Sequence, residues 1–261
     1  MRTSIVGSVV VAALAAAAQA QINVSPGNMN GWQVFTFDDG TNPNSASVTF
    51  MNGIGTPPLG SGSVQLATGA YGDGAARVAT RNFDGTPLAS ISAMTYSSYS
   101  QNASYSGLHT YLSLRVDYNN DGAEDDIIFF EPEYQNGYTG AVPTQADATT
   151  GLWQGWNALA GGWWSNSNVL GTGNAGADVR PLADFIAAFP NAVIAGDMAP
   201  GLRFTAGFGA PTWNDYVGYL DNFSITLTGG PAVTYDFEAA PTPGAAALFG
   251  LGGLAAFRRR R

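Results

Sequence analysis

The chain has 261 residues, of which 45% are hydrophobic and only 11% are charged, so it can build a folded core and is not disordered throughout. It contains no cysteine, which excludes disulfides and cysteine-based metal sites. The formal net charge is −9, and such a surface repels phosphate backbones, so we expect no nucleic-acid partner.

The first twenty residues have the pattern of a secretory signal peptide. Arg2 supplies a positive charge, residues 5–18 are apolar, and Ala18-Gln19-Ala20 forms a small-x-small cleavage site. We therefore expect residues 1–20 to be removed on export, so that the mature chain begins at Gln21.

Alternation of apolar and polar residues predicts nine or more strands in the body of the chain. Glycine, asparagine, aspartate and proline clusters separate these runs, which favours antiparallel pairing through turns. The predicted strands cover residues 32–37, 63–66, 76–80, 90–96, 111–118, 126–130, 202–208, 221–227 and 233–237.

The acidic stretch DYNNDGAEDD, residues 117–126, allows two interpretations. Oxygen ligands at alternate positions with Gly122 at the bend can wrap Ca²⁺, although Ile128 stands where an EF-hand carries its last acid. The alternative is a solvated turn, because these residue types favour turns. Ca²⁺ is the one cofactor we expect here, with no organic cofactor, and its predicted ligands are Asp117, Asn119, Asp121 and Asp125.

Glu131 and Glu133 flank Pro132, and on a strand their side chains would share a face. Paired carboxylates can hydrolyse glycosides, but proline disfavours a central strand. His109, the only histidine, has no nucleophile signature near it. We expect no enzymatic activity and predict no catalytic residue.

Four tryptophans lie close together at positions 153, 156, 163 and 164. Exposed rings of this kind stack on sugars, whereas buried rings build the core. Trp156, Trp163 and Trp164 are therefore candidates for carbohydrate binding. Gly161-Gly162 before the last pair favours the core alternative, because it suggests a tight turn that delivers the rings inward.

One short helix is expected near residues 181–189. Leu182, Phe185, Ile186 and Phe189 follow helical spacing, and Pro181 suits a first turn. One helix among many strands predicts an all-β fold, a single antiparallel β-sandwich of jelly-roll or concanavalin-like type over residues 21–238.

The end of the chain combines a proline motif, a short apolar run and an arginine cluster. Residues 245–257 would span about 20 Å as a helix, less than the roughly 30 Å of a bilayer core. This favours a transient membrane contact, with the arginines on the cytoplasmic side. The predicted sorting residues are Pro241, Pro243, Gly244, Arg258, Arg259, Arg260 and Arg261.

This order resembles the PEP-CTERM sorting signal of exopolysaccharide-producing bacteria, with Thr242 where that motif has glutamate. The resemblance implies a sorting tail at residues 239–261 and an exosortase-like enzyme as partner. The body also looks like a domain of exported PEP-CTERM proteins that has no assigned activity. The stretches that carry this second resemblance are 121–126, 130–132, 156–164, 189–192 and 235–238.

We therefore expect an exported protein of the cell surface or extracellular space, without enzymatic activity. Its expected role is structural or adhesive, in an exopolysaccharide or biofilm matrix. A carbohydrate-binding module that recognises matrix glycan is the alternative, and a glycoside hydrolase is a weaker one.

Overall fold

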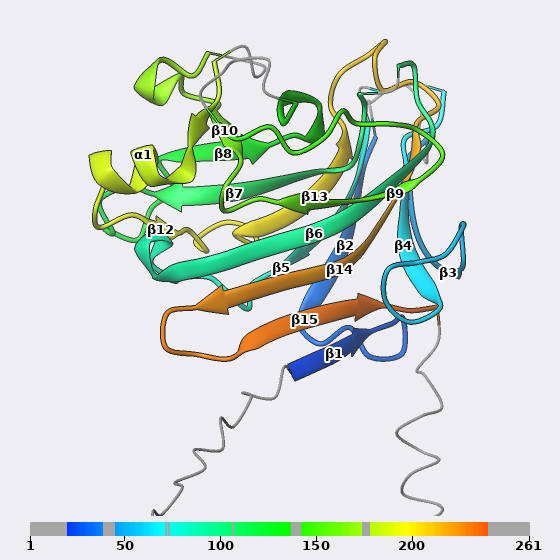
Figure 1. Cartoon of the computed structure of the whole chain (residues 1–261), viewed down its shortest axis with the longest axis horizontal. Coiled ribbons are helices and arrows are strands. Elements are labelled where there is room, and N and C mark those ends of the chain that lie inside the picture. The colour runs from blue at the N-terminus through cyan, green and yellow to red at the C-terminus, as the bar shows by residue number, and fades with distance from the viewer. Residues whose placement is uncertain are drawn as a thin grey trace, which may run out of the picture.

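The computed structural model describes residues 20–38, 45–70, 72, 74–105, 107–136, 142–173 and 178–239. They form two stacked sheets (Figure 1). The first sheet has seven strands: β1 (Ala20–Val24), β3 (Ser47–Asn52), β4 (Gly62–Ala67), β6 (Ile91–Asn102), β9 (Trp153–Asn157), β14 (Val217–Leu227) and β15 (Ala232–Phe237). Their order is β1-β15-β14-β4-β3, and β6 pairs with both β14 and β9.

The second sheet has eight strands in the order β11-β10-β8-β7-β13-β5-β2, with β12 paired to β7. Its pairs are antiparallel, whereas β1 pairs with β15 of the first sheet in parallel. The strands are β2 (Trp32–Phe37), β5 (Ala75–Thr80), β7 (Tyr111–Asp117), β8 (Asp126–Phe130), β10 (Gly162–Ser165), β11 (Arg180–Pro181), β12 (Val193–Ile194) and β13 (Leu202–Gly207).

The predicted all-β sandwich with one short helix is confirmed. Each of the nine predicted runs carries a strand, and the α-helix of the described residues is α1 (Leu182–Ala188). Leu182 and Phe185 are its buried residues, as the spacing predicted, while Pro181 serves as the N-cap without a side-chain hydrogen bond. The described part of the chain also contains three single-turn 3₁₀ helices: Leu88–Ser90, Pro132–Tyr134 and Val169–Gly171.

Aromatic rings fill the core between the sheets. Trp32 of β2 is stacked on Phe204 of the same sheet and meets Phe223, Tyr235 and Phe237 of the opposite sheet edge-on. Such edge-to-face contacts add to the hydrophobic stabilisation of the burial itself. The rings therefore tie both sheets to one core.

The central strands of the second sheet are buried on both faces. Every residue of β7 and of β13 is buried, although their sequences alternate between apolar and polar residues. The apolar set faces the first sheet, so the polar set lies on the opposite face, which we call the outer face. These polar side chains are buried although they point away from the core. Other parts of the chain must therefore surround the outer face, which lies at the bottom of a concavity.

Two regions of interest lie outside the described residues: most of the predicted signal peptide, residues 1–19, and the predicted sorting residues from Pro241 onward. No helix in the described part of the chain is long and apolar enough to cross a membrane.

Candidate functional site

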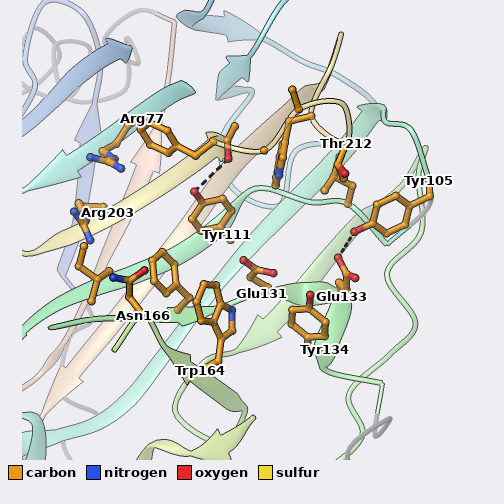
Figure 2. Close-up of a pocket in the computed structure, with 18 residues that line it drawn as sticks. Arg77, Tyr105, Tyr111, Glu131, Glu133, Tyr134, Trp164, Asn166, Arg203 and Thr212 are labelled. Atoms are coloured by element: carbon orange, nitrogen blue, oxygen red, sulfur yellow. Dashed lines mark hydrogen bonds between the residues drawn. The ribbon is translucent and has the colours of Figure 1, made fainter. Parts of the chain in front are cut away.

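A pocket of about 650 Å³ opens on the outer face of the second sheet. This volume lies within the roughly 300–1,000 Å³ typical of small-molecule sites. Its floor comes from β5, β7, β8, β10 and β13 (Figure 2). Its walls come from residues around 105–108, 131–134 and 207–213.

Strand register explains why residues far apart in the sequence meet in this pocket. Trp164 lies opposite Phe129, Phe129 opposite Ser113, and Ser113 opposite Arg203, which makes one row across four strands. A second row, two residues along, runs from Tyr111 through Thr205 to Arg77. Because side chains alternate with period two, both rows share the outer face.

Aromatic rings form much of the pocket surface. Trp164 is half-buried and stacks on Phe129, with ring centroids 4.2 Å apart and planes at 14°. Trp213 packs against Tyr111, and Phe208 remains 50% exposed at the rim. The pocket therefore offers flat apolar faces beside its polar groups.

Two carboxyl groups lie on one side of the pocket (Figure 2). Burial raises the pKa of Glu131 to about 8, and the nearby charge of Glu133 adds to the effect. The Trp164 indole N–H acts in the opposite direction without forming a well-aligned hydrogen bond. Glu131 is therefore mostly protonated at pH 7 and can donate a hydrogen bond, whereas Glu133 accepts one from the Tyr105 hydroxyl.

Two guanidinium groups lie on the other side (Figure 2). Burial lowers the pKa of Arg203 to about 9, and the charges of Arg77 and Arg115 lower it further. Burial also lowers the pKa of Arg77. Tyr111 lies between the two sides (Figure 2). Burial raises the pKa of its hydroxyl, Glu131 raises it further, and Arg77 and Arg203 lower it. The pocket thus has positively charged guanidinium groups on one side and carboxyl groups on the other.

The three tryptophans predicted to bind sugar do not line one site. Trp156 and Trp163 are fully buried, so neither can stack on a ligand, and the core alternative is correct for both. Trp156 donates to Ser98 Oγ at 2.9 Å, and Trp163 donates to the Ala158 carbonyl at 2.8 Å. Trp164 lines the pocket, because adjacent residues of a strand point to opposite faces.

The side-chain oxygens of the four predicted Ca²⁺ ligands are turned towards backbone amides. Asp117 is buried, and its carboxylate accepts hydrogen bonds from the amides of Asn119, Asn120, Asp121 and Gly122. Asn119 and Asp121 accept from amides two residues further on, and Asp125 accepts from Tyr118. Within the described residues, no group of three His, Asp or Glu side chains is placed to hold a metal ion.

Ca²⁺ binding at this stretch stays a prediction, and a thermal melt tests it. If Asp117, Asn119, Asp121 and Asp125 bind the ion in the native state, millimolar Ca²⁺ raises the melting temperature, since a ligand of the native state alone stabilises it. Asp121→Ala removes one ligand and should abolish the rise. An equal rise in the variant would mean that the stretch is only a turn.

Glu131 and Glu133 do not share a strand, as Pro132 between them indicated, although both line the pocket. Strand β8 ends at Phe130, and Pro132 begins a 3₁₀ turn in which Glu131 is the N-cap. The proline ends the ladder because it has no amide hydrogen to donate.

Sequence reasoning missed the arginines and Tyr111. The alternation of the strand sequences did place these residues on the outer face. Tyr111 belongs to the polar set of YLSLRVDY, and Arg203 and Thr205 alternate with core residues in LRFTAG. Arg77 holds the same place in AARVAT. Only the register between these strands shows that the three residues meet.

No family model matches the sequence, and no curated protein matches it either. Solved structures do match the chain. One is the family 11 carbohydrate-binding module of a cellulosomal cellulase of Clostridium thermocellum, at 9% identity and a TM-score of 0.39, covering 76% of this chain and 88% of that one. Another is a β-1,2-glucanase from Parabacteroides distasonis, at 13% identity and a TM-score of 0.36, covering 73% of this chain and 22% of that one. At these scores neither likeness bears on what this chain binds.

Proposed function

We propose that this protein is a non-catalytic, glycan-binding β-sandwich that holds a saccharide in the pocket on its outer face. The observation that carries the proposal is the combination of flat aromatic faces with hydrogen-bonding groups in one pocket of suitable volume. Sugars have apolar ring faces and many hydroxyl groups, so they need both kinds of partner. Trp164, held against Phe129, supplies the stacking face.

The polar groups of the pocket suit hydroxyl recognition. The protonated carboxyl of Glu131 can donate, and the carboxylate of Glu133 can accept. Asn166, also in the lining, offers both functions. Binding without reaction is proposed because Glu133 is already engaged by Tyr105, which leaves it poorly placed as a second catalytic carboxylate.

The setting of this activity is part of the proposal. An exported protein, sorted to the cell surface by an exosortase-like enzyme acting on its tail, would meet the polysaccharides of an exopolysaccharide matrix there. Glycan binding then gives the adhesive role a molecular basis. The residues that support this setting are the apolar leader and the proline–arginine tail.

Trp164→Ala should weaken saccharide binding at least about tenfold, because it removes the stacking face of the pocket. Titration of soluble oligosaccharides, followed by tryptophan fluorescence and calorimetry, measures the change. Trp153→Ala is the matched control, since Trp153 is also half-buried but lies on β9 of the other sheet, packed against Tyr99.

A folded Trp164→Ala protein that binds saccharides as tightly as the unaltered chain would contradict the proposal. Release of reducing sugar from any oligosaccharide would instead favour the glycosidase alternative. In that case Glu131, with its raised pKa, would be the candidate proton donor.

A further inference from the structure

Arg203 is a buried cation without an acidic partner. The residue is 5% exposed, and within the described residues its Nε has no hydrogen-bond acceptor and its guanidinium joins no ion pair. Burying a charge is costly unless it is paired. The pocket therefore contains a charge whose partner is not supplied by this part of the chain.

Arg115 is a buried arginine on the same outer face, and unlike Arg203 it has acidic partners. It is as deeply buried as Arg203 and lies on the neighbouring strand β7. Its guanidinium pairs with Glu124 and Asp197 and donates to the Ala199 carbonyl. The contrast indicates that Arg203 is left free for a ligand, since the fold can pair a buried arginine when its role is structural.

Arg77 is held in place beside Arg203. Its Nε donates to Thr205 Oγ1 at 2.9 Å, and its guanidinium lies over the rings of Phe37 and Phe208, at 4.8 and 5.4 Å from their centroids. A guanidinium fixed in this way loses little further freedom when it binds. Among the described residues it makes no ion pair.

The two guanidiniums are neighbours on one face. Thr205 lies directly opposite Arg77, and Arg203 precedes Thr205 by two residues, which makes the arginines a diagonal pair with roughly 7–8 Å between their backbones. After the larger effect of burial, the charge of Arg77 lowers the pKa of Arg203, which reflects the repulsion between the two guanidiniums. An anion between them would relieve this repulsion and pair both charges.

We propose that the Arg77–Arg203 side of the pocket binds the carboxylate of an acidic sugar, a uronic acid unit of a polysaccharide. This inference rests on the proposed glycan-binding function and names the class of glycan. A planar carboxylate matches the fork of a guanidinium and accepts two parallel hydrogen bonds from it. The sugar ring then extends towards Tyr111 and Trp164, which line the same pocket (Figure 2).

The net charge of the chain does not oppose this assignment. The formal charge of −9 is spread over the whole sequence, and charges on the surface are screened beyond about 8 Å at physiological ionic strength. The pocket arginines are partly or fully desolvated, so their attraction for a bound carboxylate is screened much less.

Calorimetry on the full chain tests the inference with paired ligands. The acidic ligands are trisaccharides of galacturonate, glucuronate and mannuronate, and the controls are the methyl esters of the same sugars, which lack the charge. A neutral glucan trisaccharide and sodium sulfate complete the set. We expect at least one acid to bind about 10- to 100-fold more tightly than its ester, as charged hydrogen bonds predict.

Arg203→Met provides the second readout. It should remove the preference for the acid over the ester without lowering the stability of the ligand-free protein, because an unpaired buried charge is replaced by an apolar side chain. Arg180→Met is the matched control, since Arg180 is exposed on β11 and outside the pocket lining, and it should keep the preference.

The outcomes separate the inference from the function on which it rests. Equal binding of acids and esters, or tight binding of the neutral glucan alone, overturns the acidic-sugar inference and leaves glycan binding intact. Binding of sulfate as tight as that of the best acid would show a general anion site and also overturns it. If no saccharide binds, both proposals fail. A clear loss of stability in Arg203→Met would mean that Arg203 is structural.

Discussion

Replacing Trp163 with alanine is expected to lower the free energy of unfolding by about 3–5 kcal/mol, the range for large-to-small changes at fully buried aromatic sites. The ring is completely buried in the core and packs against Phe130, with centroids 5.7 Å apart. Its indole N–H donates to the Ala158 carbonyl at 2.8 Å, so the substitution also leaves a buried acceptor without its donor. Such a loss is a large share of the roughly 5–15 kcal/mol that stabilises a typical domain.

Urea unfolding followed by circular dichroism measures this loss without depending on tryptophan fluorescence. Trp164→Ala is the internal control, because the neighbouring ring is half-buried in the pocket and contributes less to the core. We expect it to cost clearly less stability than Trp163→Ala while it weakens glycan binding.

Trp163→Phe keeps the test informative if the alanine variant fails to fold. Phenylalanine retains most of the apolar contact with Phe130 but cannot donate to the Ala158 carbonyl, so we expect an intermediate loss of about 1–3 kcal/mol. Stability equal to that of the unaltered protein in both Trp163 variants would mean that the ring does not belong to the core.

The contrast between these adjacent tryptophans shows how far sequence reasoning could go. Both were candidates for sugar binding, and the glycine pair before them favoured burial. Period-two alternation requires that two adjacent strand residues point to opposite faces. It does not say which of them faces the core, because that depends on the pairing of β10 with Phe129 and Ile128 of β8.

The strands themselves were predictable because alternation is a local property. Strands β2 and β8 begin and end where the pattern predicted. The short strands β11 and β12, with two residues each, were not predicted, because two residues cannot display a period. Strand β9 was also missed, since its sequence WQGWN contains a glycine and two polar residues.

The pocket was less predictable than the fold. Glu131 and Glu133 drew attention as a pair, and both line it, but the groups that face them come from strands far away in the sequence. Arg77 and Arg203 are 126 positions apart, and they share a face only because β5 pairs with β13 in one particular register. Register of this kind is decided by the packing of the whole sandwich, so a single sequence does not contain it in readable form.

The only histidine has a structural role that sequence reasoning did not assign. His109 is buried against Trp156 and belongs to a chain of hydrogen bonds that runs from Trp156 of β9 through Ser98 of β6 to Thr149. Trp156 Nε1 donates to Ser98 Oγ, Ser98 donates to His109 Nδ1, and His109 Nε2 donates to the Thr149 carbonyl, at 2.9, 2.9 and 3.2 Å. This assignment of donors requires neutral imidazole, because protonated Nδ1 could not accept from Ser98.

The contribution of His109 to the free energy of unfolding should therefore fall as the pH drops. Burial lowers the pKa of this imidazole to about 4 in the native state, from about 6.5 in the unfolded chain, while the Thr149 carbonyl acts in the opposite direction. Between these values the unfolded state binds more protons than the native state, so the contribution of His109 is complete above pH 6.5 and lost as the pH approaches 4. At about 1.4 kcal/mol per pKa unit, the loss amounts to about 3 kcal/mol.

The direct measurement is an NMR titration of the imidazole, which is unambiguous because the chain has one histidine. We expect the ring of the native protein to stay neutral to below pH 5. His109→Gln supplies the matching stability measurement, since the glutamine amide cannot titrate. The pH dependence of unfolding should differ between the two proteins only below about pH 6.5, whatever constant offset the substitution introduces.

The unfolding free energies of the unaltered protein and of His109→Gln must be compared, because buried carboxyls change the stability with pH in the opposite direction to His109. Burial raises the pKa of Glu131 and of Asp221 to about 8 each, so both groups favour the native state increasingly as the pH falls from 8 towards 4. The total stability of the protein combines these opposing contributions, and subtraction of the His109→Gln curve isolates the histidine. A native imidazole that titrates near pH 6.5 would contradict this prediction, because it would show that the hydrogen-bonded chain from Trp156 to Thr149 accommodates the charged ring without cost.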